Sequence, residues 1–168
     1  YISRHNKAVR KIARALQRRS HRGGCYMVLD ACKAEALAEN EAAAGRVPEF
    51  LLPDTPEADR LRMRPDILRV LGLPAMPTRA ELAGACANKA RHPLQIVEVG
   101  FTPDTRWQDK LPEKQAQHAE LVAALEAAGW KVESCVVLVG HSGTVYKSGL
   151  AALERLELTK KDASALLE

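Results

Sequence analysis

The chain has 168 residues, of which 46% are hydrophobic and 27% charged, and this composition predicts one soluble globular domain over residues 1–168 with its own hydrophobic core. Aromatic residues make up only 4%, which argues against a base-stacking surface for single-stranded nucleic acid. No apolar run is long enough to cross a bilayer, so we expect no membrane partner, whereas the net charge of +4 weakly favours a polyanionic one.

The first predicted element is a basic helix over residues 2–22. An apolar stripe at helical spacing runs through Val9, Ile12 and Leu16. The segment contains no acidic residue, and its basic residues form a second face at Arg4, Lys7, Lys11, Arg14 and Arg18. A solvated charged face is the ordinary interpretation of such a pattern. Because charges of one sign repel each other along a helix, we predict instead that these basic side chains bind DNA phosphates.

The middle of the chain alternates predicted strands with irregular segments. Residues 25–32 are expected to form a strand, and a polar, Ala-rich stretch follows at 33–46. Prolines predict an irregular loop over 48–59 and then a short strand over 64–71. Residues from about 72 to 93 are expected to be an insertion that contains one short helix.

The second half begins with a mostly apolar run at 94–101, which predicts a buried strand. A helix over 112–128 should follow, with Pro112 in its first turn and Gly129 at its end. The remaining predicted elements are a strand over 130–139, a helix over 145–156 and a helical tail over about 159–167. The order helix, strand, strand, strand, helix, strand predicts an α/β fold with a central mixed sheet flanked by helices.

Two acids lie on neighbouring predicted strands. Asp66 begins one strand, and Glu98 lies inside the next among apolar residues. A buried acid costs several kcal/mol unless it is paired, protonated or bound to a metal ion. One alternative is a core acid paired with an arginine such as Arg69. The other is that Asp66 and Glu98 hold Mg²⁺ or Mn²⁺ through their oxygens, in which case replacing either acid should cost little stability.

A lysine and a histidine continue the apolar stripe of the helix predicted over 112–128. Counting back from Leu125 and Leu121 in steps of three and four, the stripe passes through His118 and Lys114. A lysine directed at the core beside two acids suits phosphodiester hydrolysis. A cation would polarise the phosphate and activate a water, and the lysine would orient that water or balance the developing charge. The alternative is that Lys114 extends past the core into solvent.

The four cysteines, Cys25, Cys32, Cys86 and Cys135, form no CxxC pair, so we expect neither zinc binding nor disulfides but reduced thiols in an intracellular protein. The chain begins at Tyr1 without an initiator Met or an apolar signal segment, and we therefore expect it to be a piece of a longer protein.

The two acids stand in motifs that resemble the PD-(D/E)XK nuclease pattern. Pro65-Asp66 matches its first half, and Glu98-Val99-Gly100 matches its second half except that Gly100 stands where the lysine is usual. Some branches of this superfamily supply the lysine from the following helix, and Lys114 takes that place here. The resemblance implies a restriction-endonuclease-like core, with Asp66, Glu98 and Lys114 as catalytic residues and a cation held by Asp66, Glu98 and the backbone carbonyl of Val99.

Within that superfamily, the chain most resembles the restriction-like endonuclease domain of site-specific non-LTR retrotransposons. Arg4-His5-Asn6 matches its basic-His-Asn motif, Arg64-Pro65-Asp66 matches its Arg/Lys-Pro-Asp motif, and His118 stands where a tyrosine is usual. The resemblance implies that His5 and Asn6 contact DNA, together with the neighbouring lysines and arginines of the same helix. It also implies a magnesium-dependent endonuclease that nicks double-stranded DNA in the nucleus to prime reverse transcription, with retroelement RNA and a reverse transcriptase domain as partners.

Three other functions remain open at this point. The chain could be a DNA-binding module that keeps a nuclease fold with a decayed site, although all three catalytic residue types are present. It could be a structure-specific junction nuclease of the same superfamily, from which only Arg4-His5-Asn6 distinguishes it. A basic scaffold or interaction domain would leave the positions of Lys114 and His118 on a core-facing stripe without a role.

Overall fold

A computed structural model describes residues 2–20, 24–30 and 47–167 of the chain. The predicted Ala-rich stretch at 33–46 and the thiol of Cys32 lie outside the described residues. Within the described ranges, no helix combines the length and the apolar character needed to span a membrane.

The centre of the fold is a four-stranded mixed sheet in the order β1-β2-β3-β4. The strands are β1 (Tyr26–Leu29), β2 (Ile67–Val70), β3 (Leu94–Thr102) and β4 (Val132–Gly140). β1, β2 and β3 pair antiparallel, whereas β3 and β4 pair parallel. A parallel pair needs a long crossover, and here helices between β3 and β4 supply it. The predicted mixed sheet flanked by helices is therefore confirmed.

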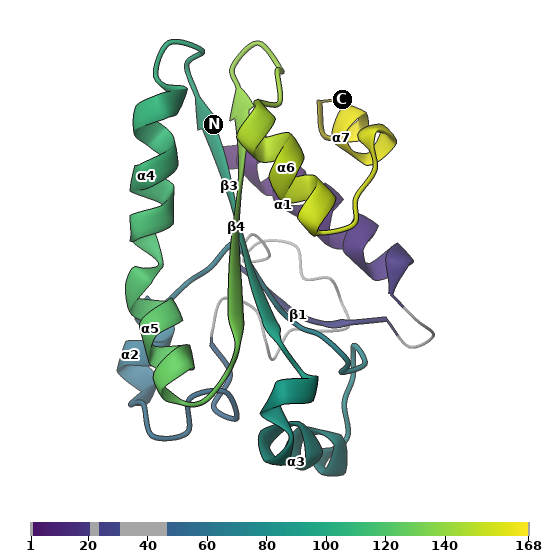
Figure 1. Cartoon of the computed structure of the whole chain (residues 1–168), viewed down its shortest axis with the longest axis vertical. Coiled ribbons are helices and arrows are strands. Elements are labelled where there is room, and N and C mark those ends of the chain that lie inside the picture. The colour runs from purple at the N-terminus through teal and green to yellow at the C-terminus, as the bar shows by residue number, and fades with distance from the viewer. Residues whose placement is uncertain (1, 21–23, 31–46, 168) are drawn as a thin grey trace.

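Helices cover both faces of the sheet (Figure 1). On one face lie α1 (Ile2–Arg19), α6 (Lys147–Arg155) and α7 (Lys160–Leu167), and on the other lie α4 (Trp107–Gln117) and α5 (Ala119–Ala127). Because side chains alternate along a strand, each strand contributes to two hydrophobic cores. In β3, Val97 and Val99 belong to the core beneath α1 and α6, whereas Ile96 packs with Leu121 of α5.

The apolar stripe predicted for α1 is confirmed, since Val9, Ile12 and Leu16 are all at most 1% exposed. The helix ends at Arg19, earlier than the predicted residue 22, and the chain turns at Ser20, whose backbone N–H donates to the carbonyl of Gln17. Residues 21–23 lie outside the described part of the chain.

The single helix predicted over 112–128 is wrong in two respects. It begins earlier, at Trp107, so that Pro112 lies inside α4 instead of in its first turn. Proline has no N–H to donate to the backbone carbonyl four residues earlier in the helix. Because Pro112 is exposed, water can satisfy that carbonyl instead. The helix is also interrupted at His118, whose φ of −111° and ψ of 14° leave the helical region, and α5 begins at the next residue. Gly129 ends α5 with a φ of +94°, a conformation that favours glycine.

The predicted irregular loop and insertion each hold a helix. α2 (Glu57–Arg62) overlaps the segment expected to be irregular, and the insertion contains α3 (Arg79–Ala87) and a short 3₁₀ turn, Lys89–Arg91. The insertion lies at the end of the β2–β3 hairpin where Val70 pairs with Leu94. Asp66 lies at the opposite end of β2, so the insertion leaves the strand pairing beside Asp66 unchanged.

Candidate active site

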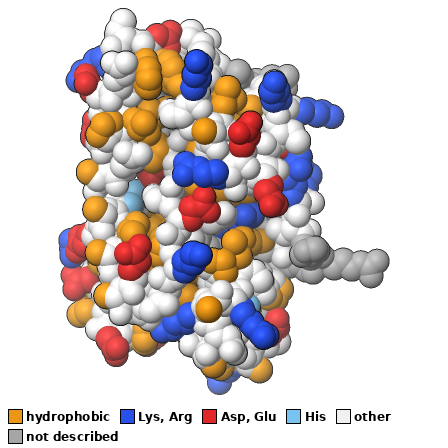
Figure 2. All heavy atoms as spheres, in the orientation of Figure 1, with side chains coloured by type: hydrophobic (Ala, Val, Ile, Leu, Met, Phe, Trp, Pro, Cys, Tyr) orange, Lys and Arg blue, Asp and Glu red, His pale blue; other side chains and the backbone are white. Residues whose placement is uncertain are grey.

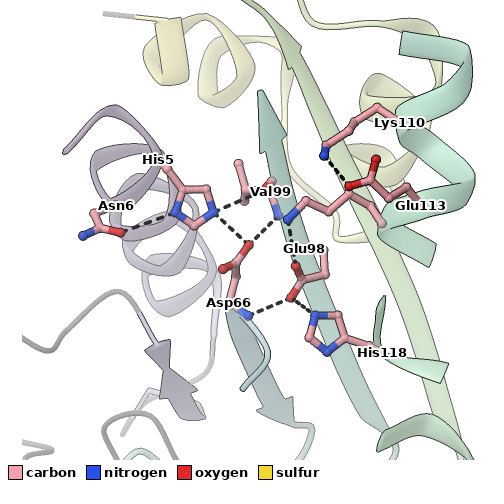
Figure 3. A network of polar contacts seen from close by, with 9 residues as sticks. His5, Asn6, Asp66, Glu98, Val99, Lys110, Glu113 and His118 are labelled. Carbon is pink, nitrogen blue, oxygen red and sulfur yellow. Dashed lines mark hydrogen bonds and ion pairs between the residues drawn. The ribbon is translucent and has the colours of Figure 1, made fainter. Parts of the chain in front are cut away.

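The two predicted acids lie side by side, Asp66 immediately before β2 and Glu98 opposite it in β3. The pairing of Ile67 with Val97 places Asp66 next to Glu98 across the antiparallel strands. The backbone N–H of Asp66 donates to Glu98 Oε1 at 2.8 Å, and the backbone N–H of Val99 donates to Asp66 Oδ2 at 2.8 Å (Figure 3). Both carboxyl groups are buried, 7% exposed for Asp66 and 2% for Glu98. Each acid therefore satisfies a buried amide, and the expectation that replacing it costs little stability is not supported.

Lys114 and His118 approach Glu98 from α4 and from the break that follows it. Lys114 Nζ lies 3.6 Å from Glu98 Oε2, and its side chain is only 13% exposed. His118 Nε2 lies 2.7 Å from Glu98 Oε1, although the buried ring is not aligned with that oxygen for a hydrogen bond. The contact is thus an ion pair when the imidazole is protonated. The alternative in which Lys114 extends into solvent does not hold.

Gly100 provides the space that the Lys114 side chain uses. A Cβ atom at position 100 would lie 3.5 Å from Cε and 3.6 Å from Cγ of Lys114, and 2.7 Å from Cδ2 of Leu138. The aliphatic part of Lys114 therefore passes directly over Gly100. The lysine from the helix occupies the region into which a side chain at position 100 would project.

Arg69 is not the partner of Glu98. Its Nε and Nη2 donate to Gln95 Oε1 at 3.0 and 2.6 Å. Arg69 shares the strand face of Ile67, which packs beneath α1, whereas Glu98 shares the face of Ile96, which packs against α5. The two side chains therefore leave the sheet in opposite directions.

His5 reaches the site from α1, on the opposite side from Lys114. Its Nε2 lies 3.1 Å from Asp66 Oδ2 and 3.1 Å from the carbonyl oxygen of Val99, and its Nδ1 lies 3.4 Å from Asn6 Oδ1 (Figure 3). The sequence predicted His5 as a DNA contact, but its ring points at Asp66. A signal for this position was present, because His5 lies four residues before Val9 and so continues the buried stripe of α1.

The charges of the site favour an ionised Asp66. Burial opposes ionisation, but the hydrogen bond and positive charge of His5, the Val99 amide and the charge of Lys114 outweigh it, so the pKa of Asp66 lies below its usual range. The hydrogen bond to Asp66 raises the pKa of His5, an effect that burial partly offsets. Asp66 is therefore a carboxylate at neutral pH and an acceptor for cationic groups.

The predicted phosphate-binding face of α1 is partly covered by α7. Lys11 donates to the backbone carbonyl of Ala165, and Asp162 lies 3.9 Å from Arg18 and 3.0 Å from Arg19. The remaining predicted contacts, Arg4, Lys7 and Arg14, are exposed. Arg4 lies over the Phe101 ring at 5.0 Å and donates to the carbonyl of His141. On the face shown in Figure 2, basic and acidic side chains are interspersed and form no large patch of one sign.

The described cysteines are single thiols. Cys25, Cys86 and Cys135 form no disulfide. Burial raises the pKa of Cys25, and burial together with the charge of Glu133 raises the pKa of Cys135 to about 11. Both thiols therefore stay protonated at neutral pH and behave as small apolar side chains.

The donor set for a cation combines side chains with the backbone. Among the described residues, no three His, Cys, Asp or Glu side chains are gathered closely enough to hold a metal ion. The carboxylate of Asp66 and the carbonyl of Val99 nevertheless share one neighbour, His5 Nε2, and Glu98 lies beside Asp66. These are the hard oxygen donors that Mg²⁺ and Mn²⁺ prefer, so the residues present fit the predicted cation.

Comparisons of the chain with protein-family models, with curated proteins and with solved structures found no match. The structure itself defines a mixed α/β fold with a four-stranded sheet flanked by helices.

Proposed function

We propose that this chain is a Mg²⁺- or Mn²⁺-dependent endodeoxyribonuclease domain with a restriction-endonuclease-like core. One observation carries the proposal: Lys114 Nζ lies 3.6 Å from Glu98 Oε2, and Glu98 bonds the backbone of Asp66, although these residues come from three separate elements. Two carboxylates beside a shielded ammonium are the groups that phosphodiester hydrolysis with a metal ion needs. The succession of α1, three antiparallel strands, α4 and the parallel β4 supports the proposed core.

Each residue has a defined task in the proposed reaction. Asp66, Glu98 and the Val99 carbonyl would hold the cation, which when bound polarises the phosphate and lowers the pKa of a water molecule. Lys114 places its ammonium group 3.6 Å from Glu98 Oε2, where it would balance the negative charge that develops on the phosphate. His118, buried against the other Glu98 oxygen, holds that carboxylate in place.

The same site supports the more specific proposal of a retroelement nuclease. The motifs Arg4-His5-Asn6 and Arg64-Pro65-Asp66 are far apart in the sequence, yet His5 and Asp66 are 3.1 Å apart. A nick made in double-stranded target DNA would then prime reverse transcription in the nucleus, with retroelement RNA and a reverse transcriptase domain as partners. Arg4, Lys7 and Arg14, which are exposed on α1, supply the phosphate contacts in this proposal.

A plasmid-nicking assay tests the proposal. Supercoiled plasmid is incubated with the protein in Mg²⁺, Mn²⁺ or EDTA, and the relaxed form is quantified. We expect nicking with either cation, none with EDTA and none with Asp66→Asn or Glu98→Gln. Asp54→Asn is the matched control, because Asp54 is an exposed acid outside the site, and it should nick like the wild type.

Two outcomes would favour other functions. DNA binding without nicking by the wild type under any cation would identify a binding module with a decayed site. Cleavage confined to four-way junctions, with intact plasmid and linear duplex, would identify a structure-specific nuclease.

A further inference from the structure

A polar cavity lies near the turn that follows β2, at the end of that strand opposite Asp66. Its volume is about 470 Å³, which is enough to hold a small molecule. Its walls come from the end of α1, the segment before β1, the turn after β2, α3 and the link after α6. The lining residues that bear on its chemistry are Arg19, Cys25, Arg69, Gly72, Glu81 and Glu157.

Arg69 contributes a buried guanidinium group to this cavity, and the residue is only 9% exposed. An arginine has five N–H donors, and two of them, on Nε and Nη2, bond Gln95 Oε1. Gln95 is held in turn by Glu133, to which its Nε2 donates at 3.2 Å. Three N–H groups of the guanidinium remain. Two of these, one on Nη1 and one on Nη2, form a second fork that fits two oxygens of one carboxylate or phosphate.

No anion balances this guanidinium among the described residues. Arg69 forms no ion pair there, and its Nη1 has no hydrogen-bond partner. Glu133 is reached only through the amide of Gln95. The thiols of Cys25 and Cys135, which lie within the field of Arg69, have raised pKa values because they are buried, so they add no negative charge. Since a buried charge is costly without a partner, the free fork favours an anion from outside the chain.

Two carboxylates at the same cavity narrow the class of ligand. Glu81 and Glu157 line it and are both exposed, while Arg19 is already paired with Asp162. Glu157 has a φ of +61°, a conformation that favours glycine, so its carboxylate is held at the cavity despite a conformational cost. A polyanion such as the DNA backbone would be repelled by these acids. A small molecule with one anionic group can place that group on Arg69 and turn the rest of its surface towards Glu81 and Glu157.

From this arrangement we infer that the cavity is a binding site for a small molecule that carries a carboxylate or phosphate group, with the free fork of Arg69 as its anchor. Gln95 and Glu133 are positioning residues, because they fix the opposite edge of the guanidinium and leave the fork directed away from themselves. The inference goes beyond the proposed function and does not depend on it, since it requires neither DNA nor a cation.

Nuclear magnetic resonance of the nitrogen-15-labelled chain tests the inference. Sodium phosphate or sodium acetate is added at an ionic strength kept constant with sodium chloride, and the backbone amide of Gly72, which lines the cavity, is followed. We expect a saturable shift with a dissociation constant on the order of 1–10 mM for at least one of the two anions. The shift should be lost in Arg69→Gln and weakened about tenfold in Arg69→Lys, which keeps the charge without the fork. Arg79→Gln is the matched control, because Arg79 is exposed and does not line the cavity.

The anion that saturates the shift at the lower concentration identifies the group that the cavity prefers. Shifts that do not saturate with either anion, or saturable shifts that persist in Arg69→Gln, overturn the inference. A shift of the Gly72 amide by a short DNA duplex, with none by phosphate or acetate, also overturns it and assigns Arg69 to the DNA backbone. If circular dichroism shows that Arg69→Gln is unfolded, Arg69→Lys decides, and an unchanged affinity in that variant overturns the inference. None of these measurements involves nicking, so their failure leaves the proposed function standing.

Discussion

Lys114 can be tested by a substitution that removes only its charge. Lys114→Met keeps an unbranched apolar chain over Gly100, where the lysine stem lies 3.5 Å from a Cβ built at that glycine. It removes the ammonium 3.6 Å from Glu98 Oε2. Lys110→Met is the matched control, because Lys110 lies on the same helix but pairs with Glu113.

The expected effects on stability and on rate differ in size. At 3.6 Å and an effective dielectric constant of about 20, the attraction between the two charges is about 4–5 kcal/mol, most of which is offset by their desolvation. Glu98 also keeps the Asp66 amide and His118, so the net loss of unfolding free energy should be about 1–2 kcal/mol. The loss of a positive group at the reacting phosphate should lower the nicking rate by about 10²–10³.

Single-turnover plasmid nicking, DNA binding in EDTA and urea unfolding measure these quantities separately. A domain with a stability of about 5–15 kcal/mol stays folded after the expected loss, so a slow Lys114→Met variant cannot be explained by unfolding. Lys110→Met should nick at the wild-type rate. An active Lys114→Met together with an inactive Lys110→Met would refute the assignment and move the catalytic lysine one turn along α4.

Three further predictions concern the surroundings of the site. Asp66→Ala leaves the β3 amide that bonds its carboxylate buried without an acceptor, and it should cost about 1–3 kcal/mol in urea unfolding, more than Asp66→Asn. The pKa of His5 is raised above 6.5, so its pairing with Asp66 stabilises the fold fully below pH 6.5, and this stability is lost as the pH rises through the raised pKa. The pKa of Asp66 is lowered below 3.8, so the stability that its carboxylate contributes is present above pH 3.8 and is lost as the pH falls through the lowered pKa. The wild type should therefore lose stability relative to His5→Gln on the alkaline side, and parallel curves would contradict this. Lys7→Gln should flatten the salt dependence of DNA binding by about one unit, whereas Arg19→Gln, whose base already pairs with α7, should change it less.

The strands and their succession along the chain could be predicted because the longer strands carry strong local signals. The apolar runs of β3 and β4 and the stripe of α1 are visible in the sequence, and their positions were predicted within a few residues. The start of α4 and its break at His118 were missed. Proline is common in the first turn of a helix, and only the surrounding structure shows that Pro112 is exposed and tolerated inside α4.

The meeting of Asp66, Glu98 and Lys114 could be expected from motif spacing and helical periodicity. The contact between His5 and Asp66 was missed because the motif around His5 suggested DNA binding, although its position on the buried stripe indicated otherwise. The cover that α7 places on α1 had no local signal. It depends on how Asp162, one acid in a short terminal helix, meets arginines about 140 residues earlier in the chain.

The passage of Lys114 over Gly100 makes positions 100, 114 and 138 sterically interdependent. A larger side chain at position 100 would meet the lysine stem and Cδ2 of Leu138, so a mutation there is tolerated only when those neighbours shrink or turn away. A relative with a lysine at position 100 should therefore carry smaller residues at positions 114 and 138. If the proposed nuclease function holds, a lysine at this site can stand on the strand or on the helix but not on both, and a glycine at position 100 leaves room for the helix position.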